Sequence, residues 1–268
     1  MNSLESLVKK SVAGDKNALE EVVLQIQDLI YNLAIRMLWH PDDAKDATHD
    51  ILIKIITNLS SFNHKSTFTT WVYRIASNYL INFKKKKITN SINFNTYELQ
   101  LNQGLSDSIN YTTNKAEQNL LIQEAKIGCS NAMLQCLNKE NRLTYILGEI
   151  LEFNSTDAAL IFDITPESFR KRLSRSRKSI HNFLNKNCGI INSENTCRCY
   201  KKVDSSIKNG FIQPNRLLFA QNIKNTTLIN SIENIQDEVS FYQSNPEYKT
   251  PESLLLEVKR IINTDNNV

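Results

Sequence analysis

Apolar residues recur at steps of three and four through most of residues 1–87, which is the spacing of an amphipathic helix. The longest such stripe consists of Leu19, Val22, Val23, Ile26, Leu29, Ile30, Leu33 and Met37. A new helix is expected at Pro41, because proline suits a first helical turn and the acids Asp42 and Asp43 favour its positive dipole end. The period resumes over residues 68–83. The pattern therefore predicts a helical bundle as a first module.

The helical period is lost between residues 88 and 113, where Asn, Ser, Thr and Gln dominate. A polar segment of this kind is typical of a flexible linker. The period returns from Asn114, and Asn138 is placed to cap a further helix. Residues 114–186 are therefore expected to form a second helical module.

The second module ends with the element order of a helix-turn-helix. A short helix is expected after Asn154, a tight turn at residues 162–164, and a second helix from the Thr-Pro-Glu run at 165–167. This second helix holds six cations and no acid within residues 170–178, which suits a DNA groove, although a basic surface helix is the alternative. The candidate DNA-binding residues are Thr165, Glu167, Ser168, Arg170, Lys171, Arg172, Ser174, Arg175, Arg177 and Lys178.

The segment from residue 68 to 87 has a polar face opposite its apolar stripe. Arg74, Asn78, Asn82 and Lys85 follow one another at intervals of four, four and three. The cations at the ends of such a row can bind phosphates, and the amides between them can form hydrogen bonds with bases. Aromatic residues nearby could support unpaired bases. The alternative is an ordinary solvated helix face over an aromatic core.

Composition narrows the class of protein further. The 268 residues include only six Gly and five Pro, which favours long helices over a turn-rich β fold. The net charge of +4 is mild, so a nucleic-acid-binding chain must concentrate its cations locally. We expect a cytoplasmic protein without membrane insertion, since neither a signal peptide nor a long apolar run is evident. No catalytic motif argues for an enzyme.

Residues 187–268 have a different character. Short helices are predicted at residues 214–220 and after Pro251, and acids outnumber bases from Thr226 onward. One hypothesis is that these acidic helices fold back on the basic segment 170–178 and restrain DNA binding.

Three cysteines of this extension, Cys188, Cys197 and Cys199, leave three interpretations open. They could bind zinc or another thiophilic metal, with His181 as a fourth ligand. They could form a redox pair, because Arg198 and Lys201 would favour thiolates. They could also be inert thiols, in which case the protein has no cofactor.

Three segments together resemble the extracytoplasmic-function (ECF) sigma factors of bacterial RNA polymerase. Residues 43–55 are similar to the family's polymerase-docking helix, and residues 68–78 to its strand-melting segment. Asp157-Ala-Ala159 with residues 165–177 is similar to its fourth region. The resemblance implies an all-α chain: region 2 at residues 1–87, a linker at 88–113, region 4 at 114–186, and an extension of unknown role at 187–268.

The family resemblance also implies roles for individual residues. Asp46, His49, Asp50 and Lys54 would bind polymerase, although His49 stands where the family usually has Gln. The residues expected to bind the minus-ten element are Asn63, Lys65, Ser66, Thr67, Arg74, Asn78, Asn82, Lys84 and Lys85. The helix-turn-helix would read the minus-thirty-five element.

Partners implied by the resemblance are core RNA polymerase, promoter DNA and an anti-sigma factor. The chain would direct promoter recognition, strand opening and transcription initiation. A free-standing helix-turn-helix regulator is the first alternative. A regulator that responds to metals or thiols through the cysteines is the second.

Overall fold

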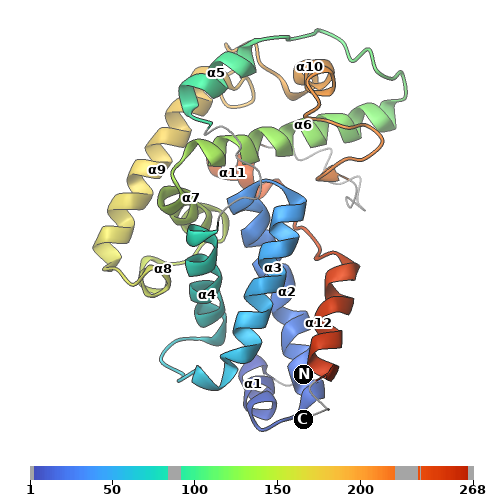
Figure 1. Cartoon of the computed structure of the whole chain (residues 1–268). Coiled ribbons are helices and arrows are strands. Elements are labelled where there is room, and N and C mark those ends of the chain that lie inside the picture. The colour runs from blue at the N-terminus through green and yellow to red at the C-terminus, as the bar shows by residue number, and fades with distance from the viewer. Residues whose placement is uncertain (1–2, 84–91, 221–234, 236, 265–268) are drawn as a thin grey trace. The chain divides into compact units, whose positions relative to one another are not determined.

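Helices form nearly all of the regular structure in this computed structural model, which describes residues 3–83, 92–220, 235 and 237–264. Over these ranges the one β contact is an isolated bridge between Cys188 and Cys197. The all-helical class that the sequence predicts is therefore confirmed. The chain divides into two compact units, which consist of residues 1–88, 153–170 and 248–268, and of residues 89–152 and 171–247 (Figure 1).

The first unit is a bundle built around one long central helix. Its elements are α1 (Leu4–Val12), α2 (Lys16–Leu38), α3 (Pro41–Thr57), the 3₁₀ turn η1 (Leu59–Ser61), α4 (Phe68–Asn82), α8 (Ser155–Phe162), the start of α9 (Pro166–Asn187) and α12 (Glu252–Thr264). Helix α2 packs against α1, α3, α4 and α12, and α8 packs against α4. The predicted stripe of α2 forms the core, since Val22, Ile26 and Leu33 are at most 1% exposed.

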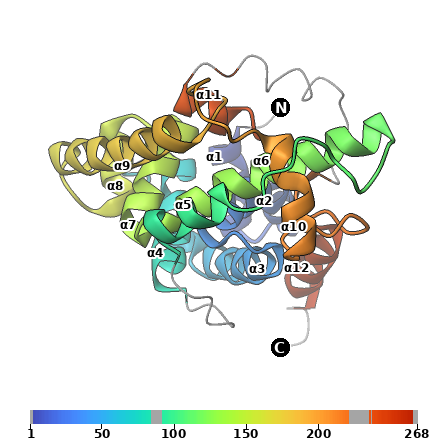
Figure 2. The ribbon, with the colours of Figure 1, turned by 90° about the horizontal axis from the view of Figure 1, so that it is seen from above.

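The second unit is built on α6. Its elements are α5 (Phe94–Asn102), α6 (Lys115–Cys136), α7 (Lys139–Tyr145), the π-helical turn η2 (Ile146–Ile150), the rest of α9, the 3₁₀ turn η3 (Cys199–Lys202), α10 (Val203–Lys208) and α11 (Glu238–Gln243). Helix α5 packs along α6 (Figure 2). Leu121 of α6 shares a hydrophobic cluster with Val203 and Ile212 of the extension. The extension therefore supplies part of the core of this unit.

Within the second unit, residues 171–187 of α9 pack closely against α7 and η2. Ser176 is fully buried, and its hydroxyl donates to the Asn141 carbonyl at 3.2 Å. Gly148 of η2 faces Leu173, and a β-carbon at this glycine would lie 2.7 Å from a Leu173 methyl group. The absence of a side chain at Gly148 therefore lets η2 approach α9 closely.

Two local predictions differ from the structure. Residues 94–102 of the expected flexible linker form α5, because Asn93 and Thr96 make a capping box and Tyr97 and Leu101 are buried. Residues 214–220 do not form the expected helix. The N–H groups of Leu218, Phe219 and Ala220 instead donate to the buried carboxylate of Glu124, at 2.8 to 3.0 Å.

The fold-back hypothesis for the acidic tail stays a prediction, and residues 221–234 of that tail lie outside the described ranges. Helix α12 packs on α2 and α3 within the first unit, because Leu254, Val258 and Ile262 give it an apolar face. From the extension, α11 reaches α9 through Glu238, whose carboxylate lies 3.3 Å from His181. As for membranes, none of the helices in the described ranges has both the length and the apolar character that crossing would require.

Candidate nucleic-acid and partner interfaces

The predicted polar row of α4 lies on one exposed face of the helix. Arg74, Asn78 and Asn82 are all exposed there, at intervals of four residues. The Asn82 amide donates to the Asn78 carbonyl at 2.8 Å, which holds this side chain along the helix surface. Lys84 and Lys85 lie outside the described residues. The row therefore presents one guanidinium and two amides side by side.

Arg74 has an acidic neighbour that the sequence did not indicate. Its Nη2 atom lies 3.8 Å from Oδ2 of Asp163, the residue that ends α8 in a left-handed conformation. Tyr73 packs edge-on against Phe153, with the ring centroids 4.9 Å apart. Both charged side chains are exposed, and exposed ion pairs contribute little to stability. A DNA phosphate can therefore compete with Asp163 for Arg74.

The loop before α4 places its predicted DNA-binding residues at the surface, with Asn63, Lys65 and Thr67 exposed and Ser66 half-buried. The Asn63 side chain accepts the Lys65 N–H at 3.3 Å and so forms a local turn. The Thr67 hydroxyl caps α4 by accepting the Thr70 N–H at 3.1 Å. Under the loop, the buried ring of Phe62 contacts those of Phe68 and Trp71, with centroids 5.2 and 5.6 Å away. These aromatics therefore belong mainly to the core, and the half-buried Trp71 is the most accessible of the three.

Helix α3 carries the predicted polymerase-binding row. Asp46, Asp50 and Lys54 follow one another at four-residue spacing, and His49 lies with its Nδ1 atom 3.6 Å from Oδ1 of Asp50. The Tyr79 hydroxyl of α4 donates to Asp50, and the Lys54 ammonium lies 5.8 Å from the Tyr79 ring centroid. Burial, followed by this bond to Asp50, raises the pKa of Tyr79 well above its ordinary value. Tyr79 therefore positions the row, a role that its place in the apolar stripe did not reveal.

Helices α8 and α9 follow one another in the order predicted for the helix-turn-helix. Asp163 makes the left-handed turn, and the Thr165 hydroxyl caps α9 by accepting the Ser168 N–H at 3.2 Å. Phe169 and Ile180 are buried on the inner face of α9. The ten predicted DNA-binding residues of this motif are exposed, except for the half-buried Arg172.

The Arg177 side chain of α9 is committed to a contact with a buried acid. The Arg177 Nε atom donates to Oε1 of Glu149 at 2.8 Å, and Glu149 is only 6% exposed. Arg170 donates to the Ser155 hydroxyl at 3.1 Å, but both of these side chains are exposed. Glu149 lies on a different element from the basic segment, so sequence spacing could not indicate this pair.

The cysteines do not form a metal-ligand set in the described part of the chain, where no three His, Cys, Asp or Glu side chains gather closely enough to hold an ion. His181 faces Glu238. Burial raises the pKa of Cys197 to about 11 and that of Cys199 to about 12. These raised pKa values disfavour the thiolate form, on which thiol redox exchange depends.

The cations expected to activate these thiols are also engaged elsewhere. Arg198 donates to the backbone carbonyls of Ser193 and Cys197, and Lys201 pairs with Asp107 at 2.6 Å. The arrangement favours the interpretation of Cys197 and Cys199 as inert thiols.

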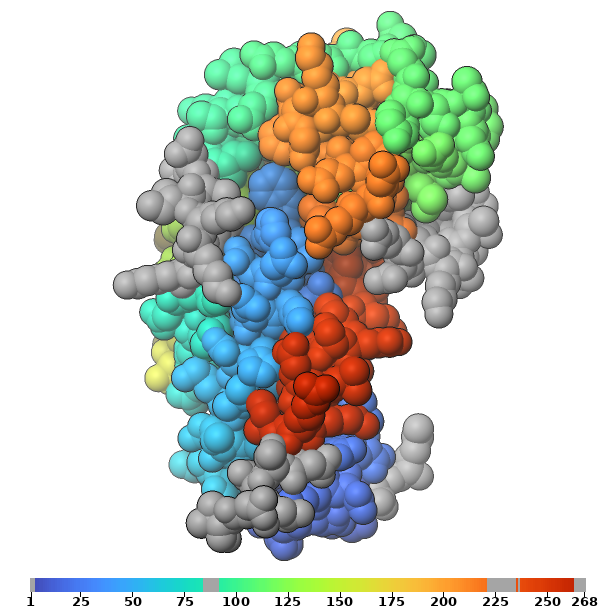
Figure 3. Space-filling view, turned by 45° about the vertical axis from the view of Figure 1, so that its right-hand side comes forward, coloured from blue at the N-terminus to red at the C-terminus, as the bar shows by residue number. Residues whose placement is uncertain are grey.

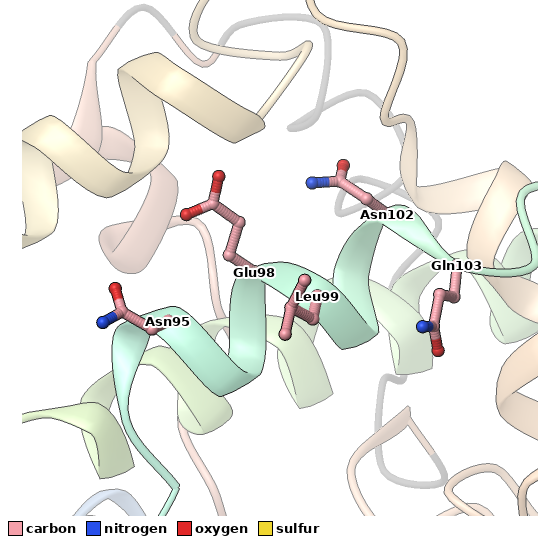
Figure 4. Close-up of a pocket in the computed structure, with 5 residues that line it drawn as sticks. All are labelled: Asn95, Glu98, Leu99, Asn102 and Gln103. Carbon is pink, nitrogen blue, oxygen red and sulfur yellow. The ribbon is translucent and has the colours of Figure 1, made fainter.

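A pocket along α5 offers no chemistry of its own. It is lined by Asn95, Glu98, Leu99, Asn102 and Gln103 (Figure 4). Its single carboxylate, Glu98, pairs with Lys186 at 2.6 Å. The exposed rows on α3, α4 and α9 are therefore the strongest candidate sites.

Comparison with known proteins identifies the class of protein. Residues 22–88 match the family model of sigma-70 region 2. The chain is 26% identical over 186 residues to the ECF RNA polymerase sigma factor SigW of Bacillus subtilis, covering 66% of this chain and 96% of that protein. It is also 26% identical over 180 residues to the ECF RNA polymerase sigma-E factor of Escherichia coli K12, covering 66% and 91%. The solved structure of CnrH with the cytosolic domain of CnrY matches with a TM-score of 0.47 and 17% identity, over 67% of this chain and 96% of that one.

The region 2 match contains α3 and α4, which carry the polar rows described above. Sigma factors are promoter-recognition subunits rather than enzymes. The chain therefore carries a sigma-70 region 2 at residues 22–88 and is similar to ECF RNA polymerase sigma factors over 66% of its length. About a third of its length lies outside the alignments with these relatives.

Proposed function

We propose that the chain binds core RNA polymerase and directs promoter recognition, strand opening and the initiation of transcription. The observation that carries this proposal is the pair of polar rows on α3 and α4 within the segment matched by sigma-70 region 2. One row suits a protein partner and the other suits nucleic acid. Catalysis belongs to the polymerase, and this chain is not an enzyme.

The work divides among four segments in this proposal. Residues 1–87 act as region 2, residues 88–113 as the linker, residues 114–186 as region 4, and residues 187–268 as an extension.

Region 2 opens and reads the minus-ten strand. Extruding a base from a duplex costs a few kcal/mol, so a surface that accepts it supplies both melting energy and specificity. The loop of residues 63–67 is exposed above an aromatic cluster and carries one cation, Lys65. Arg74, Asn78 and Asn82 continue the polar surface along α4. We assign the flipped base to the loop and the adjoining strand to α4.

Region 4 reads the duplex at the minus-thirty-five element. Helix α9 presents its exposed cations along one face, where they can neutralise phosphates, and its N-terminal residues Glu167 and Ser168 can meet base edges. The buried Phe169 and Ile180 fix the opposite face. Arg177 contributes less than its neighbours because it is paired with Glu149.

Helix α3 docks on the polymerase. The acids Asp46 and Asp50, with Lys54, offer a mixed-charge row whose geometry Tyr79 sets through Asp50. We further expect a cytoplasmic location and an anti-sigma factor as a regulatory partner, as the family implies.

Run-off transcription tests the proposal. Core polymerase with and without the chain is supplied with fragmented genomic DNA, and start sites are mapped. New start sites that require the chain, preceded by shared minus-ten and minus-thirty-five elements, are expected. Absence of any chain-dependent start would refute the proposal.

A gel shift separates the chain from a free-standing regulator. We expect tight promoter binding only when core polymerase is present. A tight complex between duplex DNA and the chain alone would favour the regulator instead.

A further inference from the structure

The extension ends in a segment that is specifically bound to the first unit. Tyr248 pairs through its backbone with the side chain of Asn32 on α2: Asn32 Nδ2 donates to the Tyr248 carbonyl at 2.7 Å, and Asn32 Oδ1 accepts the Tyr248 N–H at 2.9 Å. Asn32 is only 8% exposed, so this two-way bond satisfies a buried amide. The Arg36 guanidinium lies 5.5 Å from the Tyr248 ring centroid.

Asp28, one turn earlier on α2, binds the next two residues of the tail. Its Oδ1 atom accepts both the N–H and the hydroxyl of Thr250, at 2.9 and 2.8 Å, and its Oδ2 atom accepts the Lys249 ammonium at 2.8 Å. The pairs Asp28–Thr250 and Asn32–Tyr248 fix the register of the tail against α2. Such directional bonds distinguish this contact from a merely apolar one.

Helix α12 then packs on both α2 and α3. Leu254 and Val258 are fully buried, whereas Leu256 on the opposite side is 59% exposed. The Lys259 ammonium lies 3.4 Å from Glu20 of α2, and the Lys45 ammonium of α3 lies 3.5 Å from Glu257. Figure 3 shows α12, in red, against the light-blue surface of α3.

This position adjoins the row that is proposed to dock on polymerase. Lys45, which contacts α12, precedes Asp46 and lies about one helical turn, or ~6 Å, from His49. A stable protein interface covers roughly 800 Å² on each partner, which is a patch about 30 Å across. His49 lies about 40° around α3 from Lys45, so a polymerase surface that contacts His49 would reach the strip that α12 occupies.

We propose that the tail from Tyr248 to Ile262 is a built-in competitor for the polymerase-docking face of α3. The inference rests on the proposed function of that face. While the tail is bound, the strip beside Asp46 and His49 is covered, and the affinity of the chain for core polymerase is reduced. The apparent affinity is set by the fraction of molecules in which the tail has left.

The test compares two full-length variants of α12. Val258→Asp places a charge on the buried face, and Leu256→Asp places the same charge on the exposed face. Binding to core polymerase is measured by anisotropy of the labelled chain, and tail release by trypsin cleavage after Lys259 and Arg260. We expect Val258→Asp to be cleaved faster and to bind core about tenfold more tightly than wild type, if the tail is bound in about nine molecules of ten. Leu256→Asp should match wild type in both.

Different failures have different meanings. A released tail in Val258→Asp, with core affinity no higher than that of Leu256→Asp, would overturn this inference and leave the proposed function intact. Absence of core binding by every variant would overturn the proposed function, and this inference with it. If Val258→Asp does not fold, Thr250→Val removes one bond to Asp28 with little change of shape. It should then bind core more tightly than wild type, and unchanged affinity would overturn the inference.

Discussion

At the scale of single residues, helix α9 contains cations that act in stability and cations that act in DNA binding. Arg177 pairs with a carboxylate that is almost fully buried, whereas Arg175 is exposed. Removing one member of a partly buried pair leaves the other desolvated without a partner. The two arginines therefore separate stability from DNA binding, although they lie two residues apart.

Replacing Arg177 by Ala should lower the free energy of unfolding by about 1–2 kcal/mol, since Glu149 loses a charge-assisted hydrogen bond at the protein interior. Replacing Arg175 by Ala should change stability by less than about 0.5 kcal/mol and weaken holoenzyme binding at the minus-thirty-five element. Urea denaturation and salt-dependent promoter binding measure the two effects. Equal loss of stability in both variants would contradict this division.

Lys126 links stability to pH, because its side chain is fully buried in the second unit. It donates to the Ser244 hydroxyl at 2.6 Å and to the Asn245 amide oxygen at 3.1 Å. Burial lowers its pKa to about 8. The folded protein therefore releases this proton at a lower pH than the unfolded chain does.

Stability should consequently depend on pH through Lys126. Between pH 8 and the ordinary lysine pKa of about 10.4, the unfolded state binds the proton and the folded state does not, so the free energy of unfolding rises with pH. We therefore compare the free energy of unfolding of wild type with that of Lys126→Met. From pH 7 to pH 10, the free energy of unfolding of wild type should rise by about 2 kcal/mol relative to that of Lys126→Met. Buried thiols titrate in both proteins, and their contribution cancels. A difference that is constant with pH would show that Lys126 keeps an ordinary pKa.

At the scale of elements, the cap of α9 determines where the recognition helix begins. The Thr165 hydroxyl accepts the Ser168 N–H, and Pro166 occupies the first helical position. The cap thereby fixes the first turn, whose side chains are proposed to meet base edges.

Thr165→Ala should reduce the free energy of unfolding by about 1 kcal/mol, because the Ser168 N–H loses its partner. Thr165→Ser keeps the hydroxyl and should restore most of this loss. Thermal or urea unfolding of the three proteins is the measurement. Equal stability of Thr165→Ala and wild type would indicate that the cap contributes nothing.

Elements specified by local signals could be predicted from the sequence. The stripe of α2, Pro41 at the start of α3, and the caps Asn138 and Thr165 all act within a few residues of one helix, and the structure confirms each. Helix α5 was missed because its nine residues bury only Tyr97 and Leu101, and Tyr97 stacks on Phe183, which lies far away in the chain.

Elements that depend on distant contacts could not be predicted in this way. Residues 214–220 resemble a short helix locally, but the carboxylate of Glu124, about ninety residues earlier, takes the N–H groups of residues 218–220. At the candidate sites, too, contacts between residues distant in the sequence could not be predicted. Spacing places Asp50 and Arg74 on helix faces, but it cannot reveal their contacts with Tyr79 and Asp163.

At the scale of the whole molecule, the proposed function assigns single-stranded DNA to one unit and most duplex contacts to the other. The loop at residues 63–67 and the row on α4 lie in the first unit, and the exposed cations from Lys171 to Lys178 lie in the second. The energetic demand on the two surfaces differs. The first must offset the unstacking of bases, whereas the second binds DNA that stays paired.

A template that is already open at the minus-ten element separates the cost of strand opening from the binding of duplex DNA. Lys65→Ala and Asn78→Ala should reduce open-complex formation on an intact promoter more than on a premelted one, because the premelted template removes the cost of opening. Arg175→Ala should reduce binding by the same factor on both templates, since the minus-thirty-five duplex is identical in each. Promoter binding and abortive transcription by the holoenzyme on the two templates are the measurements.

If Lys65→Ala and Arg175→Ala responded alike to premelting, the two surfaces would not divide the work of strand opening and duplex recognition. If all three variants lost the same factor on both templates, the polar surface of the first unit would contribute to binding but not to melting.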